Sequence, residues 1–187
     1  MFFNRHIKQG KEAGSGALTF IEKSFYNSKY HDGMKFTPPH DLFDDMYIYG
    51  FCSNFITTIL NYVIGGKKWD YKKKVEFIQE AFYVIDPTGN LLNKHLEISN
   101  DNNLIEELKV DKNFIPGNDA ALNLVGVLFG IFKEDDPDPM IIEAKQIADS
   151  QETLYTSIGI YNDNPNVSIA TAVAMLSLFP YVKKEWH

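Results

Sequence analysis

Two histidine-aspartate doublets lie in the first quarter of the chain, and their residue types could bind a metal ion. The doublets, with a further aspartate one helical turn later, are His31-Asp32, His40-Asp41 and Asp44. Neutral imidazole and carboxylate groups bind divalent metals, and a bound metal can lower the pKa of a water molecule enough for it to attack a substrate. A metal-dependent hydrolase is therefore one hypothesis for the function.

The doublets resemble the HD doublet of the metal-dependent phosphohydrolases, which are all-α proteins. That family spreads its histidines and a final aspartate over several helices, whereas the only later histidines here are His95 and His187. Asp41 and Asp44 also have a structural explanation, because acidic side chains are favourable in the first turn of a helix. We therefore assign the chain to no family, predict no bound metal, and keep the hydrolase as an alternative.

A second candidate site is the stretch GGKKWDYKKK, residues 65–74, which holds five lysines. The residues that could bind an anion or an acidic partner are Lys67, Lys68, Trp69, Lys72, Lys73 and Lys74. The last three lysines fall in the first turn of a predicted helix, where the helix dipole opposes positive charge by about 0.3 to 1 kcal/mol each. Either the lysines are simply solvated, or a phosphate-bearing ligand or an acidic protein surface compensates them. The acidic loop KEDDPDP of this same chain could supply such a surface by self-association.

A polar line runs down the otherwise apolar stretch over residues 40–64. Gly50, Asn54, Thr57 and Asn61 recur at spacings of four, three and four, so they share one face of a helix. Asn54 and Asn61 are predicted to be mostly buried, either satisfied by hydrogen bonds within the core or lining a pocket for a small ligand. This stretch is unlike a membrane helix for two reasons. It contains two Asn and two Thr, and its length barely reaches the ~20 residues that a membrane span needs.

Enzyme signatures are otherwise missing from the sequence. It contains no G-x-x-x-x-G-K-S/T phosphate loop, no H-E-x-x-H and no G-x-S-x-G motif. The lone Cys52 lies in an apolar run, where cysteine most often acts as a small hydrophobic core residue. We therefore expect no cofactor, and enzyme activity is disfavoured.

The composition of the chain restricts the partners it can bind and the cellular compartment in which it is expected. The net charge of −7 and the pI near 5.2 disfavour binding to nucleic acid, because the chain as a whole repels a phosphate backbone. The hydrophobic fraction of 44% is that of a globular protein with a packed core. The apolar run at the N-terminus is too short for a secretion signal, which together with the single cysteine predicts a cytoplasmic location.

Helices are the elements that must position these residues. Apolar residues recurring at three and four positions predict helices over residues 17–30, 40–64, 69–86, 91–98, 103–110, 119–132, 139–161 and 164–180. Thr37, Asn103 and Asn118 are predicted N-caps, and Gly65 with Gly66 a stop. No run alternates apolar and polar residues as a strand would. The helices near residues 55, 126 and 172 carry lines of small residues, so they are expected to contact one another at the centre.

The predicted fold is all-α, a single-domain helical bundle of about six to eight helices with two or three very apolar central helices. Residues 1–14 are predicted to be a flexible N-terminal arm and residues 15–187 the helical domain. The leading functional hypothesis is a small cytoplasmic protein with a regulatory or adaptor role, which acts through protein-protein interaction and could form a homodimer. The alternatives are a protein or enzyme that binds a small or phosphate-bearing ligand along the Asn54 helix, and the metal hydrolase.

Overall fold

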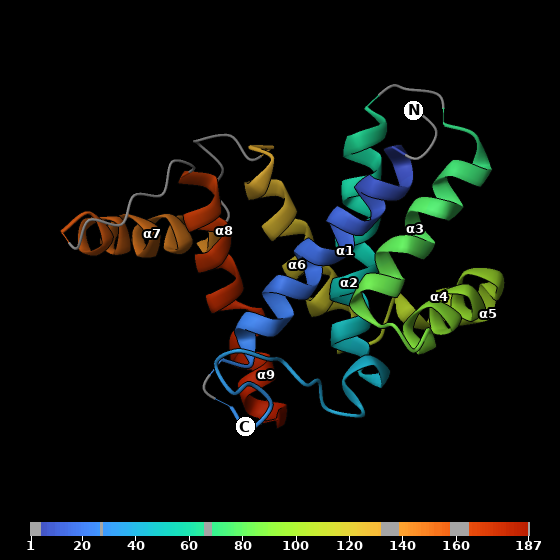
Figure 1. Ribbon diagram of the computed structural model, residues 1–187, viewed down its shortest axis with the longest axis horizontal. Helices are drawn as coiled ribbons and strands as arrows, with labels where there is room; N and C mark the ends of the chain where they lie inside the picture. The colour runs from blue at the N-terminus through green and yellow to red at the C-terminus, as the bar shows by residue number, and fades with distance from the viewer. Residues whose placement is uncertain (1–4, 27, 66–68, 132–138, 158–164, 187) are drawn as a thin grey trace.

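A computed structural model describes residues 5–26, 28–65, 69–131, 139–157 and 165–186, and this part of the chain is all-α (Figure 1). Its elements are α1 (Arg5–Ser24), the 3-10 helix η1 (Leu42–Asp44), α2 (Met46–Ile64), α3 (Tyr71–Ile85), α4 (Asn90–Asn100), α5 (Asn102–Leu108), α6 (Phe114–Leu128), α7 (Pro139–Ser157), α8 (Pro165–Leu176) and α9 (Leu178–Trp186). Only Ser177 separates α8 from α9, so the described residues hold eight α-helices when these two are counted as one. The predicted all-α bundle of six to eight helices is confirmed.

The prediction of a loosely held arm is wrong for residues 5–14, which form the first half of α1. Gly10 and Gly14 are buried against α3, and a Cβ atom at either position would collide with the carbonyl oxygen of Phe77 or Ala81. These glycines weaken the helix by about 1 kcal/mol each relative to alanine, but they let the two backbones approach closely. The sequence analysis placed them in a flexible arm, whereas they lie on the face of α1 that contacts α3.

A second close contact joins α2 and α6. A Cβ atom at Gly50 of α2 would lie 2.5 Å from the carbonyl oxygen of Phe114, and one at Gly117 of α6 would collide with the carbonyl oxygen of Tyr47. The small-residue line predicted on this helix therefore does pack against another helix. The contact pairs Tyr47 with Gly117 and, further along, Tyr62 with Phe129, so α2 and α6 run parallel.

The three most apolar helices are arranged in a row rather than as a mutually contacting trio. α6 packs against both α2 and α8, whereas α2 and α8 are not among the helix pairs that pack closely in the described part of the chain. The row contributes a large part of the buried core, including Phe51, Leu124 and Val173. The sequence correctly marked these helices as buried, but it could not show which of them lies in the middle.

Several helix boundaries differ from those predicted. α2 begins at Met46, because the chain after Pro39 first forms η1, and the cap is Asp45 rather than Thr37. Asp101 rather than Asn103 caps α5. α6 begins at Phe114, so Asn118 lies inside the helix instead of capping it. The predicted end of α2 is confirmed, since Gly65 takes the left-handed conformation with φ 41°.

One helical stretch of the described residues, Asn166–Trp186, is long and apolar enough by length and composition alone to cross a membrane. It is not the stretch over residues 40–64 that the sequence singled out. Many helices of soluble cores have the same length and composition, and this one holds buried Ala170, Ala172 and Val173 that face the rest of the protein. The absence of a membrane span remains a prediction.

Candidate functional site

The histidine-aspartate doublets do not form a metal site. His31 Nε2 lies 3.3 Å from a carboxylate oxygen of Glu22, and the carboxylate of Asp32 accepts the backbone N–H groups of Met34 and Lys35 within its own turn. His40 is almost fully exposed, with 97% of its side chain accessible. In the described part of the chain no three His, Cys, Asp or Glu side chains are grouped so that they could hold a metal ion. The structure therefore does not bring the two doublets and Asp44 together as one set of ligands.

The lysine-rich stretch is described only in part, since Lys67 and Lys68 lie outside the described residues. Lys72, Lys73 and Lys74 are all exposed in the first turn of α3. Asp70 explains in part why positive charge is tolerated at this end of the helix. Its carboxylate caps the helix by accepting the N–H of Lys73 and also lies 3.0 Å from Lys73 Nζ. Trp69 is only half-buried, and it packs edge-on against His6 and Phe77.

The polar line of α2 divides into a packed half and an exposed half. Asn54 donates a hydrogen bond of 2.7 Å to the carbonyl oxygen of Asn118, and this bond joins α2 to α6. Within α2, Asn54 also accepts a hydrogen bond of 3.0 Å from Thr58 Oγ1. Asn54 is half-buried and its amide is satisfied within the protein. Asn61 is exposed, so the prediction that it would be buried is wrong. The reason is its place in the last turn of α2, where the helix reaches the end of the bundle.

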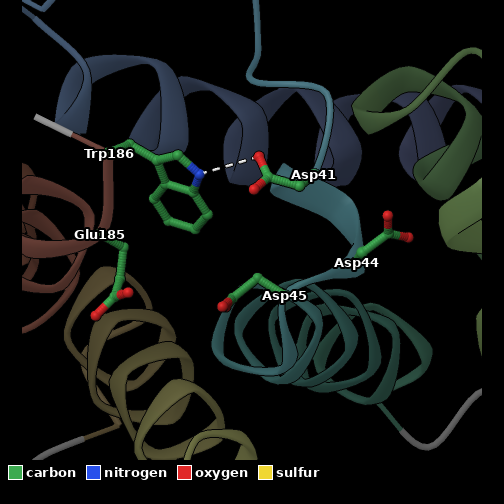
Figure 2. Close-up of a pocket in the computed structure, with 5 residues that line it drawn as sticks. All are labelled: Asp41, Asp44, Asp45, Glu185 and Trp186. Carbon is green, nitrogen blue, oxygen red and sulfur yellow. Dashed lines mark hydrogen bonds between the residues drawn. The ribbon is translucent and has the colours of Figure 1, made fainter.

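A pocket of about 280 Å³ opens between η1, the start of α2 and the end of α9 (Figure 2). It is lined by four carboxylates and one indole, which belong to Asp41, Asp44, Asp45, Glu185 and Trp186. Figure 2 shows the Trp186 ring forming one wall, with Asp41 beside it and Glu185 and Asp45 lower in the view. The lining contains no basic side chain, although Lys184 Nζ lies 2.9 Å from a carboxylate oxygen of Glu185. The carboxylates therefore make the acidic pocket attractive to cations.

Asp45 has a structural role on one side of the pocket. One of its carboxylate oxygens caps α2 by accepting the backbone N–H groups of Tyr47 and Ile48, and the other accepts the hydroxyl of Tyr181 at 2.8 Å. The rings of Tyr47 and Tyr181 stack with centroids 3.9 Å apart. Burial, and then the hydrogen bond to the Asp45 carboxylate, raise the pKa of Tyr181, so this hydroxyl stays protonated and keeps donating.

Trp186 forms the opposite wall and is held from two directions. Its Nε1–H donates a hydrogen bond of 3.2 Å to a carboxylate oxygen of Asp41, and its ring packs against Phe25 at a centroid distance of 5.8 Å. The ring is only partly buried. The indole therefore presents an aromatic face beside the carboxylates of Asp41 and Glu185.

Lys94 lies behind the acidic pocket rather than in it. Its ammonium group donates a hydrogen bond of 2.7 Å to the backbone carbonyl of Asp44 and sits 5.3 Å above the ring of Tyr49. Burial lowers the pKa of Lys94, although the nearby carboxylates of Asp44 and Asp45 oppose that change. The lysine thus anchors α4 to η1 and offsets part of the negative charge from behind.

The sequence analysis proposed two of the five lining residues, but as metal ligands, and it did not propose the other three. Asp41 and Asp44 were considered as metal ligands, whereas Asp45, Glu185 and Trp186 were not among the predicted site residues. Glu185 and Trp186 follow Asp41 by more than 140 residues, and nothing in the local pattern KKEW indicates that they reach it. No family model, curated protein or solved structure matches this chain.

His95, which follows Lys94, makes stability depend on pH. Burial against Tyr49 and Phe82 lowers its pKa below the usual 6.5, so the folded protein binds a proton at this position less readily than the unfolded chain does. The stabilisation is fully present above pH 6.5 and is lost as the pH falls toward the folded-state pKa. In thermal scans from neutral to mildly acidic pH, the His95→Gln variant should lose stability less steeply than the parent. Identical slopes would contradict this role for His95.

Proposed function

We propose that this protein acts through contact with a partner protein, in a regulatory or adaptor role, and that the acidic pocket receives a cationic side chain of that partner. The observation that carries the proposal is the lining itself, in which four carboxylates and one indole surround about 280 Å³ of space without a basic group among them. An ammonium or guanidinium group satisfies both features, because it pairs with carboxylates and is attracted to the face of an indole ring.

The size of the pocket is compatible with a single side chain. Sites for drug-sized ligands and cofactors usually enclose roughly 300 to 1,000 Å³, and this pocket falls just below that range. A lysine or arginine side chain is long and thin, with an apolar stem that can lie along Trp186 while the charged end meets Asp41 and Glu185.

The test is a titration with a short peptide that contains lysine and arginine, followed by the indole N–H signal of Trp186 in nuclear magnetic resonance spectra. The chain has two tryptophans, and a Trp69→Phe variant assigns the two signals. A cation entering the pocket should shift the Trp186 signal, because that N–H donates to Asp41. The double change Asp41→Asn with Glu185→Gln should weaken binding by about tenfold, since each exposed ion pair contributes up to roughly 1 kcal/mol.

The matched control is the double change Glu97→Gln with Glu143→Gln, which alters the net charge equally at exposed positions of α4 and α7. It should leave the affinity unchanged apart from a small long-range effect. A second control peptide carries norleucine in place of lysine and arginine, and it should not bind. The proposal is wrong if the Trp186 signal does not respond to the basic peptide, or if the two double variants lose affinity to the same extent.

A further inference from the structure

The end of the molecule remote from the acidic pocket gathers basic residues from two helices. Successive contacts join His6 to Glu76, Gly10 to Phe77 and Gly14 to Ala81, so α1 and α3 run parallel and begin at the same end. Figure 1 shows both helix starts at the top of the view, next to the last turns of α2. We call this surface the basic end and define it by Arg5, Lys8, Lys72, Lys73 and Lys74, all of which are exposed.

The basic groups are exposed enough to meet an outside partner, although three of the five make surface ion pairs. Lys72 lies 3.8 Å from Glu76, Lys73 lies 3.0 Å from Asp70 and Lys8 lies 3.6 Å from Glu12, but the lysine in each of these pairs is between 48% and 84% exposed. Such surface pairs contribute little and exchange readily. In the described residues Arg5 and Lys74 make no ion pair within 4.0 Å.

Exposed aromatic side chains lie among these charges. Tyr71, the first residue of α3, is 83% exposed, and Tyr62 in the last turn of α2 is 50% exposed. Tyrosine is enriched where proteins meet the interface between water and lipid, because its ring is apolar and its hydroxyl is polar. Basic side chains around such rings add attraction to anionic head groups.

The separation of basic and acidic groups determines which end of the molecule can face an anionic surface. The acidic pocket is built from the start of α2 and the region beyond the end of α1, and these helices of 19 and 20 residues separate it from the basic end by about 30 Å. The molecule as a whole carries −7 and would be repelled by an anionic surface, but only one end can face a plane at a time. From these observations we propose that the basic end docks on an anionic lipid bilayer, which leaves the acidic pocket facing away from the membrane.

The bilayer is favoured over an acidic protein because of the exposed rings. An acidic protein surface would satisfy the lysines, but it gives no reason to hold Tyr71 almost fully in solvent at the start of the helix. Insertion at the level of the head groups gives the ring of Tyr71 an apolar environment, with Tyr62, which already packs on Phe129, beside it. The inference concerns a surface other than the acidic pocket, so either can fail without the other.

The experiment is cosedimentation of the full chain with vesicles of phosphatidylcholine alone and with vesicles in which one lipid in three is phosphatidylserine. The parent should bind only the anionic vesicles and should dissociate as salt is added, because the attraction is screened over about 8 to 10 Å. Each basic residue near such a surface strengthens association by roughly fivefold, so the triple change of Lys72, Lys73 and Lys74 to Gln should weaken binding on the order of one hundredfold. Tyr71→Ser should weaken it as well.

The matched control is the triple change of Lys35, Lys109 and Lys112 to Gln, which removes three exposed lysines that precede η1 or lie near the start of α6. It should retain vesicle binding at the same net charge. A thermal scan of each variant confirms that it is folded. The proposal is overturned if the parent ignores anionic vesicles at low salt, if it binds neutral vesicles equally well, or if both triple variants lose binding alike. Binding to soluble polyglutamate without binding to vesicles also overturns it and points to an acidic protein partner.

Discussion

Replacing Gly14 by alanine should lower the free energy of unfolding by about 2 kcal/mol, whereas the same change at Gly16 should leave it unchanged or raise it slightly. A Cβ atom at Gly14 collides with the backbone of Ala81, which cannot move without shifting α3. Overpacking of this kind costs about 1 to 3 kcal/mol, and the better helix propensity of alanine offsets up to about 1 kcal/mol. At Gly16 the nearest atom is the tip of the Phe55 side chain at 3.4 Å, which is an ordinary contact.

The two variants make a matched pair, because both carry the same substitution in the interior of α1 two residues apart. Urea denaturation followed by circular dichroism measures the difference, with similar denaturant dependence expected for both proteins. If residues 5–14 were a loose arm, neither substitution would matter. Equal stability of the Gly14→Ala and Gly16→Ala proteins would therefore contradict the packing of α1 on α3.

The Asp86→Ala change should have the largest effect on stability, a loss of about 3 kcal/mol. Asp86 is 2% exposed, and its carboxylate accepts the N–H of Thr88 at 3.0 Å, the hydroxyl of Thr88 at 2.6 Å and the N–H of Leu91 at 2.8 Å. Hydrogen bonds to a charged group contribute about 1.5 to 3 kcal/mol, and removing the acceptor leaves the buried N–H of Leu91 without a partner. The turn between α3 and α4 would lose the group that organises it.

Two further substitutions distinguish the contribution of the Asp86 hydrogen bonds from that of a simple helix cap. Asp86→Asn keeps one carbonyl oxygen in place, so it should cost clearly less than the alanine change. Asp101→Ala removes an exposed carboxylate whose oxygen accepts only the N–H of Asn103, and the loss of such a cap costs about 1 kcal/mol. Chemical denaturation of the three variants in parallel ranks them, and an Asp86→Ala protein no less stable than the Asp101→Ala protein would show that the network contributes little.

Local pattern was sufficient to predict the kind of fold and several of its boundaries. The three-and-four spacing of apolar residues over 69–86 predicted the helix observed as α3, Tyr71–Ile85, and Gly65 ends α2 as predicted. The lack of alternating segments correctly indicated no sheet, since the described residues pair as β only at the single bridge between His31 and Phe36. These features depend on interactions within a few residues, and a single sequence contains all of that information.

The partners of each helix face were decided only by the tertiary structure. Gly10 and Gly14 fell in the predicted flexible arm, but α3 lies against them. The burial predicted for Asn61 fails because this residue lies on an exposed face of the last turn of α2. A line of small residues indicates that something packs closely, but it does not identify the partner. The sequence alone therefore predicted contacts among α2, α6 and α8 without their order.

The acidic pocket shows most clearly which features follow from the local sequence and which depend on the tertiary structure. The acidity of Asp41, Asp44 and Asp45 was evident from the sequence and has a local cause, since such residues favour the beginning of a helix. Their conversion into a pocket depends on Tyr181, Glu185 and Trp186, which the stacking of Tyr181 on Tyr47 and the packing of Trp186 on Phe25 bring across the chain. Contacts between residues more than 130 positions apart are set by how helices fill space together, and no short pattern in a single sequence specifies that arrangement.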